Sequence, residues 1–435
     1  MDALTSQTHR GRLPHRAWWV AAAALLVIIV AGSFSTLPGL LTGPLHGEFG
    51  WSRGSIGLAA SVNMVLHGLT APFAAALMDR FGIRRVVAVA LLVIASGAGL
   101  TTVMAAAWQF TLYWGVLVGL GTGSVATAFG ATVTQRWFVR RRGLVTGVLA
   151  SGSVFGQMVF LPALSWVVDR HGWRPSLVTL ALGACATVPL MWLVLRDHPA
   201  DVGREPYGAD RHVPRPAPAA GAGRRAVAVL RDAARTGPFW LMAGAFAVCG
   251  ASTNGIMWTH FTPAAHDHGM PATTASSLLA AIGFFNVVGT VASGWATDRH
   301  DPRRLLALFF ALRGLLLVFL PLLMSATVQP SMIAFVVLFG LLDLATVPPV
   351  VALCREFHPG AGAVAFGWVS AAHQAGAALA AYGGGAARDA FGTYAPVWMA
   401  LGALCAGAAL LSLLVRRTAP ADRATGPCLT AVDRR

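Results

Sequence analysis

The segment AALMDRFGIRR (residues 75–85) lies between two apolar runs and has a counterpart in GWATDRHDPRR (residues 294–304). In each segment an Asp-Arg pair is followed by three residues and then by two arginines, and the two segments are 219 residues apart. Asp169 and Asp389 form a second pair, 220 residues apart, each with a glycine three residues further on. Two repeated patterns at nearly the same sequence offset indicate an internal duplication.

The composition around these segments is that of a membrane protein. Of 435 residues, 56% are hydrophobic and 11% are charged, whereas soluble chains carry about 25% charged residues. The mean hydropathy is +0.65. So few charges cannot cover the surface of a soluble protein of this size, which excludes an aqueous enzyme, a nucleic-acid-binding protein and a disordered scaffold. The net charge of +15 comes from arginines clustered between apolar runs, which is typical of membrane topology.

The apolar runs predict twelve transmembrane helices. A hydrocarbon core of ~30 Å requires ~20 residues of helix, and the first run is too long for a cleavable signal peptide. The predicted spans are residues 17–41, 54–78, 86–106, 109–135, 143–168, 176–195, 237–262, 274–297, 305–326, 331–353, 364–387 and 395–415. They predict an all-α polytopic membrane protein, with two six-helix bundles related by pseudo-two-fold symmetry.

The arginines predict which side of the membrane each loop faces. With a cytoplasmic start, 27 of the 32 arginines fall in cytoplasmic segments, four fall in outer loops, and Arg313 lies within a span. Cytoplasmic loops of membrane proteins carry such an excess of basic residues. We therefore expect a multi-pass protein of the inner (plasma) membrane, with both termini in the cytoplasm.

A polar segment with eight arginines and five prolines, residues 196–236, separates the first six spans from the last six. We expect it to be a cytoplasmic linker, with a short basic amphipathic helix near residues 224–235 that lies against the anionic leaflet. The predicted domains are a cytoplasmic tail, a six-helix bundle, the linker, a second six-helix bundle and a second cytoplasmic tail, at residues 1–16, 17–195, 196–236, 237–415 and 416–435. Many transporters are built from such repeats and hold their substrate between them.

With these motifs, the chain resembles the major facilitator superfamily, and within it the monocarboxylate-transporter-like branch. The superfamily's signature between helices 2 and 3 is similar to residues 75–85, with Ala75 in place of its first glycine. The branch's aromatic-Phe pair, basic cluster and spaced glycines at helix 5 are similar to WFVRRRGLVTGVLASG, residues 137–152. FGWS at residues 49–52 and GWR at residues 172–174 are similar to bacterial members.

The chain departs from the branch at two places. The acidic-Gly-Gly-Trp entry to helix 1 is absent, and the Asp and Arg that the branch places in helix 8 align with Asn286 and Thr290. The proton-coupling role that the resemblance implies for those two positions is therefore not carried over.

Two charged residues are predicted deep within the spans, Arg313 and Asp343. Each alone would cost roughly 2.5–3.5 kcal/mol on an insertion scale, so we expect them to be paired or to face water. In one interpretation Arg313 helps to bind an anionic substrate while Asp343 takes up a proton. In the other, the two form a static ion pair that braces the second bundle. Pro348 and Pro349 are expected to bend the helix that carries Asp343.

Other polar residues within the spans are candidates for contacting substrate or protons: Asn63, His67, Asn254, Trp258, Asn286, His373 and Gln374. A histidine can carry a proton near physiological pH, or it can bond to a neighbouring helix. The structural interpretation is favoured for His67. Both stay open for His373, because the resemblance implies that helix 11 borders the substrate cavity.

The two duplicated loops are interpreted as conformational latches, in which an aspartate contacts arginines and helix ends in one state only. The latch residues are Asp79, Arg80, Arg84 and Arg85 in the first loop, and Asp298, Arg299, Arg303 and Arg304 in the second. In the alternative, these arginines only anchor the topology. Four glycines in the fifth span indicate close helix packing rather than ligand contact: Gly143, Gly147, Gly152 and Gly156.

The sequence and the resemblance together predict a secondary active transporter that moves a small organic anion, a monocarboxylate, with a proton by alternating access. The alternative is a proton-driven exporter of a drug-like or hydrophobic metabolite. The sequence has no metal-ligand motif, nucleophile elbow or nucleotide-binding loop, so we expect no enzyme activity, cofactor or metal. The expected partners are the small anionic substrate, protons and the lipid bilayer, with no nucleic acid, and the expected state is a monomer.

Overall fold

The computed structural model describes residues 15–34, 37–51, 53–210 and 221–415. The predictions for residues 1–14 and 416–435 lie outside this part of the chain. Ten helical segments in it are long and apolar enough to cross a membrane, and a bent pair of helices makes an eleventh. A twelfth long helix, α17 (Gly362–Phe391), has 30 residues and is rich in alanine and glycine. The predicted helical membrane fold is confirmed.

The first half of the fold contains the first six spans, and two of these are divided. Its elements are α1 (Arg16–Ser33), α2 (Leu37–Phe49), α3 (Arg53–Phe81), α4 (Ile83–Thr101), α5 (Ala107–Phe110), η2 (Thr111–Val118), α6 (Gly119–Ser124), α7 (Thr127–Trp137), α8 (Arg142–His171) and α9 (Trp173–Val194). The predicted first span is shared between α1 and α2. The predicted fourth span runs from α5 to α7 and includes a π-helical turn, η2.

The linker and the second half follow. Their elements are η3 (Pro199–Val202), α10 (Ala222–Ala233), α11 (Gly237–Gly250), η4 (Ala251–Gly255), α12 (Met257–Asp267), α13 (Ala272–Thr297), α14 (Pro302–Leu323), α15 (Pro330–Asp343), α16 (Val347–Phe357), α17 and α18 (Ala395–Leu414). The seventh span bends by 45° where α11 and η4 meet α12.

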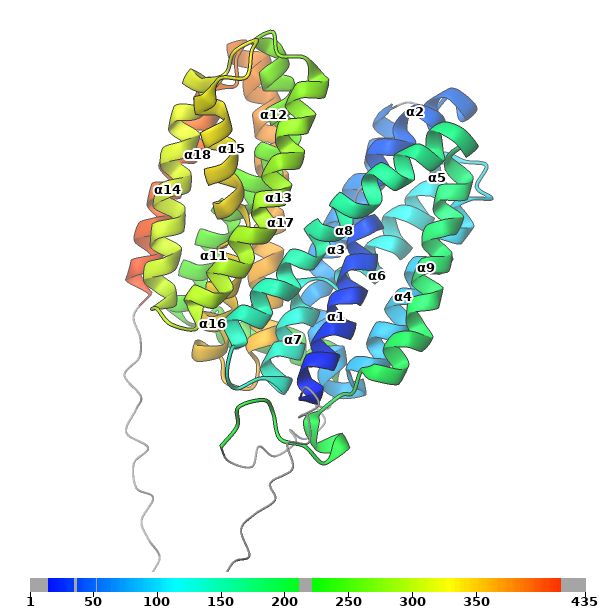
Figure 1. The fold of residues 1–435 in the computed structure, drawn as a ribbon, viewed down its shortest axis with the longest axis vertical. Helices are drawn as coiled ribbons and strands as arrows, with labels where there is room; N and C mark the ends of the chain where they lie inside the picture. Colours follow the sequence, from blue (N-terminus) through cyan, green and yellow to red (C-terminus); the bar gives the residue numbers. More distant parts are fainter. Residues whose placement is uncertain (1–14, 35–36, 52, 211–220, 416–435) are drawn as a thin grey trace, which may run out of the picture.

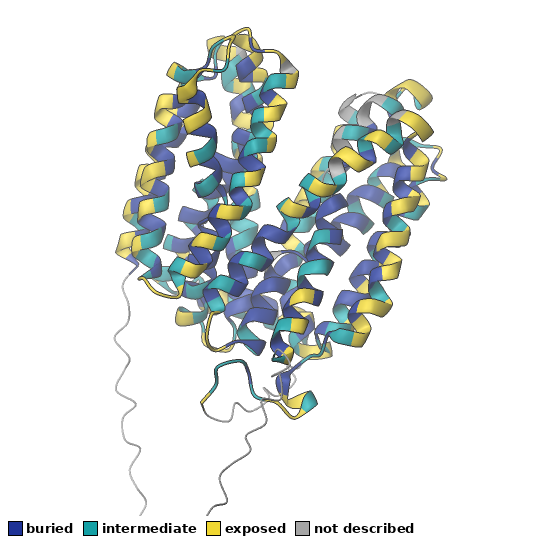
Figure 2. Cartoon of the chain, viewed as in Figure 1, coloured by how far each residue is buried: buried dark blue, intermediate teal, exposed yellow. Residues whose placement is uncertain are grey.

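The two halves meet near the linker and diverge toward the opposite end of the molecule (Figure 1). We call these the linker end and the far end. Each half has its own apolar core, with Trp114 buried in the first and Phe310 and Trp398 in the second. The outward faces carry exposed residues (Figure 2), among them large apolar side chains such as Leu193 and Leu322. Such faces suit a lipid solvent better than water.

The linker helix α10 lies across the seam between the halves. Its alanines Ala222 and Ala226 are buried in a small apolar cluster with side chains of α3 and α17. The indole N–H of Trp368, on α17, donates to the carbonyl of Ala226 at 2.9 Å. The prediction that this helix lies on the anionic leaflet is therefore corrected. Its apolar face consists of small alanine side chains, which let the helix pack closely on α3 and α17.

Candidate functional site

The tenth span is interrupted directly after Asp343. α15 ends at that residue and α16 begins at Val347, with Pro348 and Pro349 in its first turn. Proline has no N–H, so the carbonyls of Leu344 and Ala345 cannot have their usual helical partners, and the end of α15 leaves the carbonyls of Leu342 and Asp343 without theirs. The predicted disruption of this helix is confirmed, and it leaves main-chain acceptors in the interior of the second half.

Arg313, from the middle of α14, supplies donors at this interruption. Its guanidinium donates to the carbonyl oxygens of Leu342 and Asp343, the latter at 2.6 Å. It also reaches the Sγ atom of Cys249 at 3.1 Å and the hydroxyl of Ser252 at 3.4 Å. Because a helix C-terminus carries partial negative charge, a fully buried arginine is stabilised there.

The carboxylate of Asp343 bonds to other helices. Its Oδ2 atom accepts from Asn286 at 2.7 Å and from the indole N–H of Trp258 at 3.2 Å. Its Oδ1 atom is buried and has no hydrogen-bond partner among the described residues. The prediction of a direct ion pair between the Asp343 carboxylate and Arg313 is corrected, because the guanidinium is occupied by the carbonyls at the helix break.

A second group of candidates lies where α3 meets α17, at the seam between the halves. A ring nitrogen of His67 lies 3.3 Å from the hydroxyl of Thr122. The side chain of Gln374 packs so closely on Gly68 that a Cβ there would lie 2.8 Å from its Cγ. The Oε1 atom of Gln374 is buried without a hydrogen-bond partner among the described residues.

His373 connects this seam to the arginine site. Its ring packs against Phe246, with 4.9 Å between the ring centroids, and its main chain packs so closely on Gly250, next to Cys249, that no Cβ fits there. His67 precedes Gly68, which packs on Gln374, so the two histidines lie on the helices that meet at this seam. The structure thus places both predicted histidines at the seam.

Two predicted candidates lie apart from these groups. Asn63 donates to the carbonyl of Trp114 at 3.0 Å, a contact within the first half. Asn254 is half-buried in the π-helical turn η4, and its carbonyl accepts from Thr259 at 2.8 Å. Within the described residues, no group of three or more His, Cys, Asp and Glu side chains is placed to hold a metal ion.

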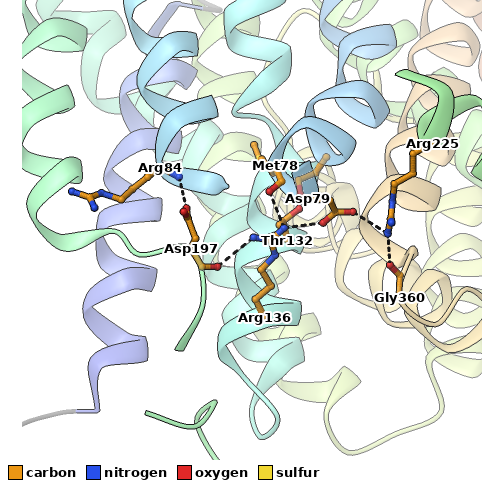
Figure 3. Close-up of polar contacts among 9 residues, drawn as sticks. Met78, Asp79, Arg84, Thr132, Arg136, Asp197, Arg225 and Gly360 are labelled. Carbon is orange, nitrogen blue, oxygen red and sulfur yellow. Dashed lines mark hydrogen bonds and ion pairs between the residues drawn. The ribbon is translucent and has the colours of Figure 1, made fainter. Parts of the chain in front are cut away.

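At the linker end, Asp79 joins the first half to the linker helix (Figure 3). Its carboxylate pairs with Arg136 of α7 at 2.8 Å and with Arg225 of α10 at 3.2 Å. Arg225 also donates to the carbonyl of Gly360, in the second half, at 3.0 Å. This bridge therefore connects three parts of the chain.

The three arginines predicted as partners of Asp79 either contact other groups or are exposed to solvent. The main-chain N–H of Arg84 donates to Asp197 at 2.8 Å, and its side chain bonds to the carbonyl of Trp192 at 2.6 Å. Arg80 and Arg85 are exposed. Asp197 thus accepts from the first turn of α4, where Gly82, at φ 88°, leaves no room for a side chain.

The second loop contacts the first half directly. The carboxylate of Asp298 accepts from the main-chain N–H groups of Gly143 at 2.7 Å and Leu144 at 3.0 Å. It therefore caps the N-terminus of α8, where a negative charge is stabilised. The other predicted members are placed differently: Arg299 stacks on Trp295, Arg303 pairs with Asp301 at 2.7 Å, and Arg304 is exposed.

The glycines of α8 face two different helices. A Cβ on Gly147 would lie 2.5 Å from the carbonyl oxygen of Thr290, and a Cβ on Gly143 would lie even closer to the carbonyl oxygen of Gly294, so both glycines face α13 in the other half. Gly152 and Gly156 face α1, in their own half. The first pair therefore lies in the contact between the halves.

Comparison with known proteins decides the family. The model of the Major Facilitator Superfamily matches residues 23–264 and 248–427. The chain belongs to the Major Facilitator Superfamily. Monocarboxylate transporter 13 of Bos taurus is 27% identical over 365 residues, which cover 82% of this chain and 79% of that protein. The gallate transporter of Pseudomonas putida is 25% identical over 325 residues, covering 69% and 70%. These relatives place the chain in the monocarboxylate-transporter-like branch.

Among solved structures, the superfamily transporter FucP in its outward conformation shares the fold. It has a TM-score of 0.65 and 16% identity, and the match covers 93% of this chain and 100% of FucP. Members of the superfamily are transporters rather than enzymes, so this chain is a multi-pass membrane transporter.

The carboxylate of Asp343, at the end of α15, contacts α13 through Asn286. Asn286 in turn accepts from the hydroxyl of Thr290 at 3.1 Å, so these two residues of α13 are bonded to each other. No local sequence pattern indicates that Arg136, Arg225 and Cys249 join these polar contacts, since their partners are distant in the chain.

Proposed function

We propose that this transporter carries a small organic anion, a monocarboxylate, together with a proton by alternating access. The observation that carries the proposal is the Asp343 carboxylate, a titratable group in the interior with one oxygen unbonded. A proton on Oδ1 removes a negative charge from a site of low dielectric. The names of the curated relatives, which refer to monocarboxylates and gallate, support a carboxylate as substrate.

The coupling follows from charge balance. A carboxylate that enters the interior alone brings an uncompensated negative charge, which costs several kcal/mol. If Asp343 takes up a proton at the same time, the loaded carrier has the same net charge as the empty one. The proton therefore lowers the barrier to the conformational change that carries the anion across.

Trp258 provides the connection between the proton site and the substrate path. Its indole N–H bonds to Asp343, and its ring lies 3.5 Å from where a Cβ of Gly283 would be. Met158, from the other half, approaches the same position at 3.7 Å. The Asp343 site is thus connected through Trp258 to the contact between α8 and α13, where the two halves face each other.

The contacts at the linker end describe the closed side of the alternating-access cycle. The Asp79 bridge and the Asp298 cap hold the ends of the two bundles together, and the opposite state requires both to separate. We propose that the linker end faces the cytoplasm, because the arginine clusters lie there. In this proposal residues 17–195 and 237–415 move as two bodies within one monomer.

Transport in proteoliposomes tests the proposal. Purified protein is reconstituted and supplied with radiolabelled monocarboxylates, dicarboxylates and aromatic acids, with and without an inward proton gradient. We expect the gradient to stimulate uptake of at least one monocarboxylate, and protein-free liposomes provide the control. Uptake at the same rate with and without the proton gradient would contradict symport. Proton-driven efflux of a hydrophobic compound would also contradict it and would favour the exporter.

A further inference from the structure

A basic cavity of about 620 Å³ lies at the linker end, away from the seam between His67 and His373. Seven arginines and two aspartates are among its lining residues, an excess of five positive charges. Asp79 already pairs with Arg136 and Arg225, and Asp197 accepts from the main chain of Arg84. The carboxylates present are therefore too few to neutralise the walls.

The lining comes from three separate parts of the chain. Arg84 and Arg136 belong to the first half, Arg225 to the linker helix, and Arg355 to α16 in the second half. These segments approach one another only where the two bundles meet. A ligand that contacts several of these arginines would therefore join the halves.

Several donors in this lining lack acceptors. The Nε atoms of Arg84 and Arg225 and the Nε2 atom of Gln135 are buried, with no hydrogen-bond partner among the described residues. Gln135 extends from α7 toward the second half, where a Cβ on Gly362 would lie 3.2 Å from its Nε2 atom. Buried donors are almost always paired in folded proteins, so three in one lining indicate a missing acceptor.

We infer that this cavity binds a phosphate-bearing anion. A phosphate group has several acceptor oxygens and more than one negative charge, and arginine binds it through parallel N–H bonds. A single carboxylate has two oxygens and one charge, which matches neither the unpaired donors nor the excess charge. The ligand is distinct from the transported substrate, because the cavity lies at the linker end and its lining does not include His67, His373 or Gln374.

Binding at this cavity favours the closed linker end. The arginine lining is assembled only when the halves and α10 are together, so the anion binds that state in preference to the open one. A ligand with such a preference shifts the equilibrium toward the state that it binds. The anion therefore slows the opening of this end at concentrations above its dissociation constant.

The test uses full-length protein in neutral detergent at constant ionic strength. Inorganic pyrophosphate is titrated by calorimetry, and thermal unfolding is followed in parallel. Native mass spectrometry of the same protein, supplied with phosphatidylglycerol or phosphatidylcholine, distinguishes a lipid headgroup from a free phosphate. We expect saturable binding that is weakened about ten-fold or more in Arg355→Gln, as for loss of one charge-assisted bond.

Arg225→Lys is the second variant, because it keeps the charge near Asp79 while removing the Nε donor. It should also weaken binding. Arg231→Gln is the matched control, since Arg231 is exposed on the same helix and outside the cavity lining. Pyrophosphate binding lost in Arg355→Gln and kept in Arg231→Gln supports a free phosphate compound. Retention of phosphatidylglycerol alone with the same dependence supports a lipid headgroup. Binding of neither probe, or equal weakening in all three variants, overturns the inference.

Discussion

The guanidinium of Arg313 donates to the main-chain carbonyl of Asp343 at 2.6 Å, while the carboxylate of the same aspartate bonds to Asn286 and Trp258. The two charged residues are thus adjacent, but their side chains bond to different groups. Arg313 satisfies carbonyls at a helix interruption, and Asp343 keeps an oxygen unbonded. This arrangement leaves the carboxylate available for protonation without loss of the arginine's contacts.

Arg313→Gln should destabilise the second half strongly. Each buried carbonyl left without a donor costs about 1–3 kcal/mol, and two carbonyls depend on this side chain. Thermal unfolding in detergent measures the loss. Ser252→Ala, which removes a 3.4 Å contact to Arg313 and one hydrogen bond to the carbonyl of Cys249 within the same span, should reduce stability much less. Unchanged stability in Arg313→Gln would contradict the assigned role.

Asp343→Asn should preserve the fold and abolish proton-driven uptake. The asparagine oxygen can still accept from Asn286 and Trp258, but the side chain cannot take up a proton. Exchange of labelled for unlabelled substrate requires no net proton movement, so it should persist. Proteoliposome assays of both modes measure the difference. Gradient-stimulated uptake at the wild-type rate in this variant would exclude Asp343 as the proton site.

Asp79→Asn should impair turnover more than substrate binding. The change removes the charge that pairs with Arg136 and Arg225, which weakens the closed linker end by about 1–3 kcal/mol. Uptake rates compared with equilibrium substrate binding separate the two effects. Asp232→Asn is the control, because Asp232 is exposed on the linker helix α10 that carries Arg225. Equal turnover in both variants would contradict the latch.

Gly147→Ala should hinder closure of the linker end. A methyl group there would overlap the carbonyl oxygen of Thr290, and overpacking of this kind costs about 1–3 kcal/mol. The cost applies only while α8 and α13 are in contact, so uptake should slow without loss of folded protein. Gly183→Ala, at a position with open space, should transport normally. Size-exclusion profiles of both variants check that each is folded.

Stability at the far end should fall in acid. The carboxylate of Glu48 accepts from Arg174 and from the indole of Trp173, both at 2.7 Å, and these bonds lower the pKa of Glu48 below its ordinary value of 4.5. A carboxylate whose pKa is lower in the folded state than in the unfolded state stabilises the fold when the pH is above its unfolded-state pKa. This stabilisation is lost as the pH falls through the folded-state pKa. Glu48→Gln should therefore show a smaller decrease in unfolding temperature below pH 4.5 than the wild type.

Much of the fold could be predicted from local sequence features. Apolar runs of bilayer length locate the spans, because lipid cannot satisfy an exposed backbone and each crossing must be a helix. Pro348 and Pro349 predicted the disruption in the tenth span for an equally local reason. The π-helical turn η2 in the fourth span and the bend after η4 were not predicted, because packing between helices determines them.

The contacts of the candidate site required the structure. Arg313 and Asp343 could be recognised as costly charges, but their hydrogen bonds depend on carbonyls that only the helix break exposes. Asp79 was recognised by its motif, whereas its partners Arg136 and Arg225 lie far away in the chain.

Local hydropathy and charge suffice to recognise a duplicated bundle of membrane helices, because these properties act on each segment independently. Which polar groups are partners depends on how the helices pack. Among the described residues, hydrogen bonds join groups up to 155 residues apart in the chain, as between Asp298 and Gly143, and no local pattern encodes such a pairing.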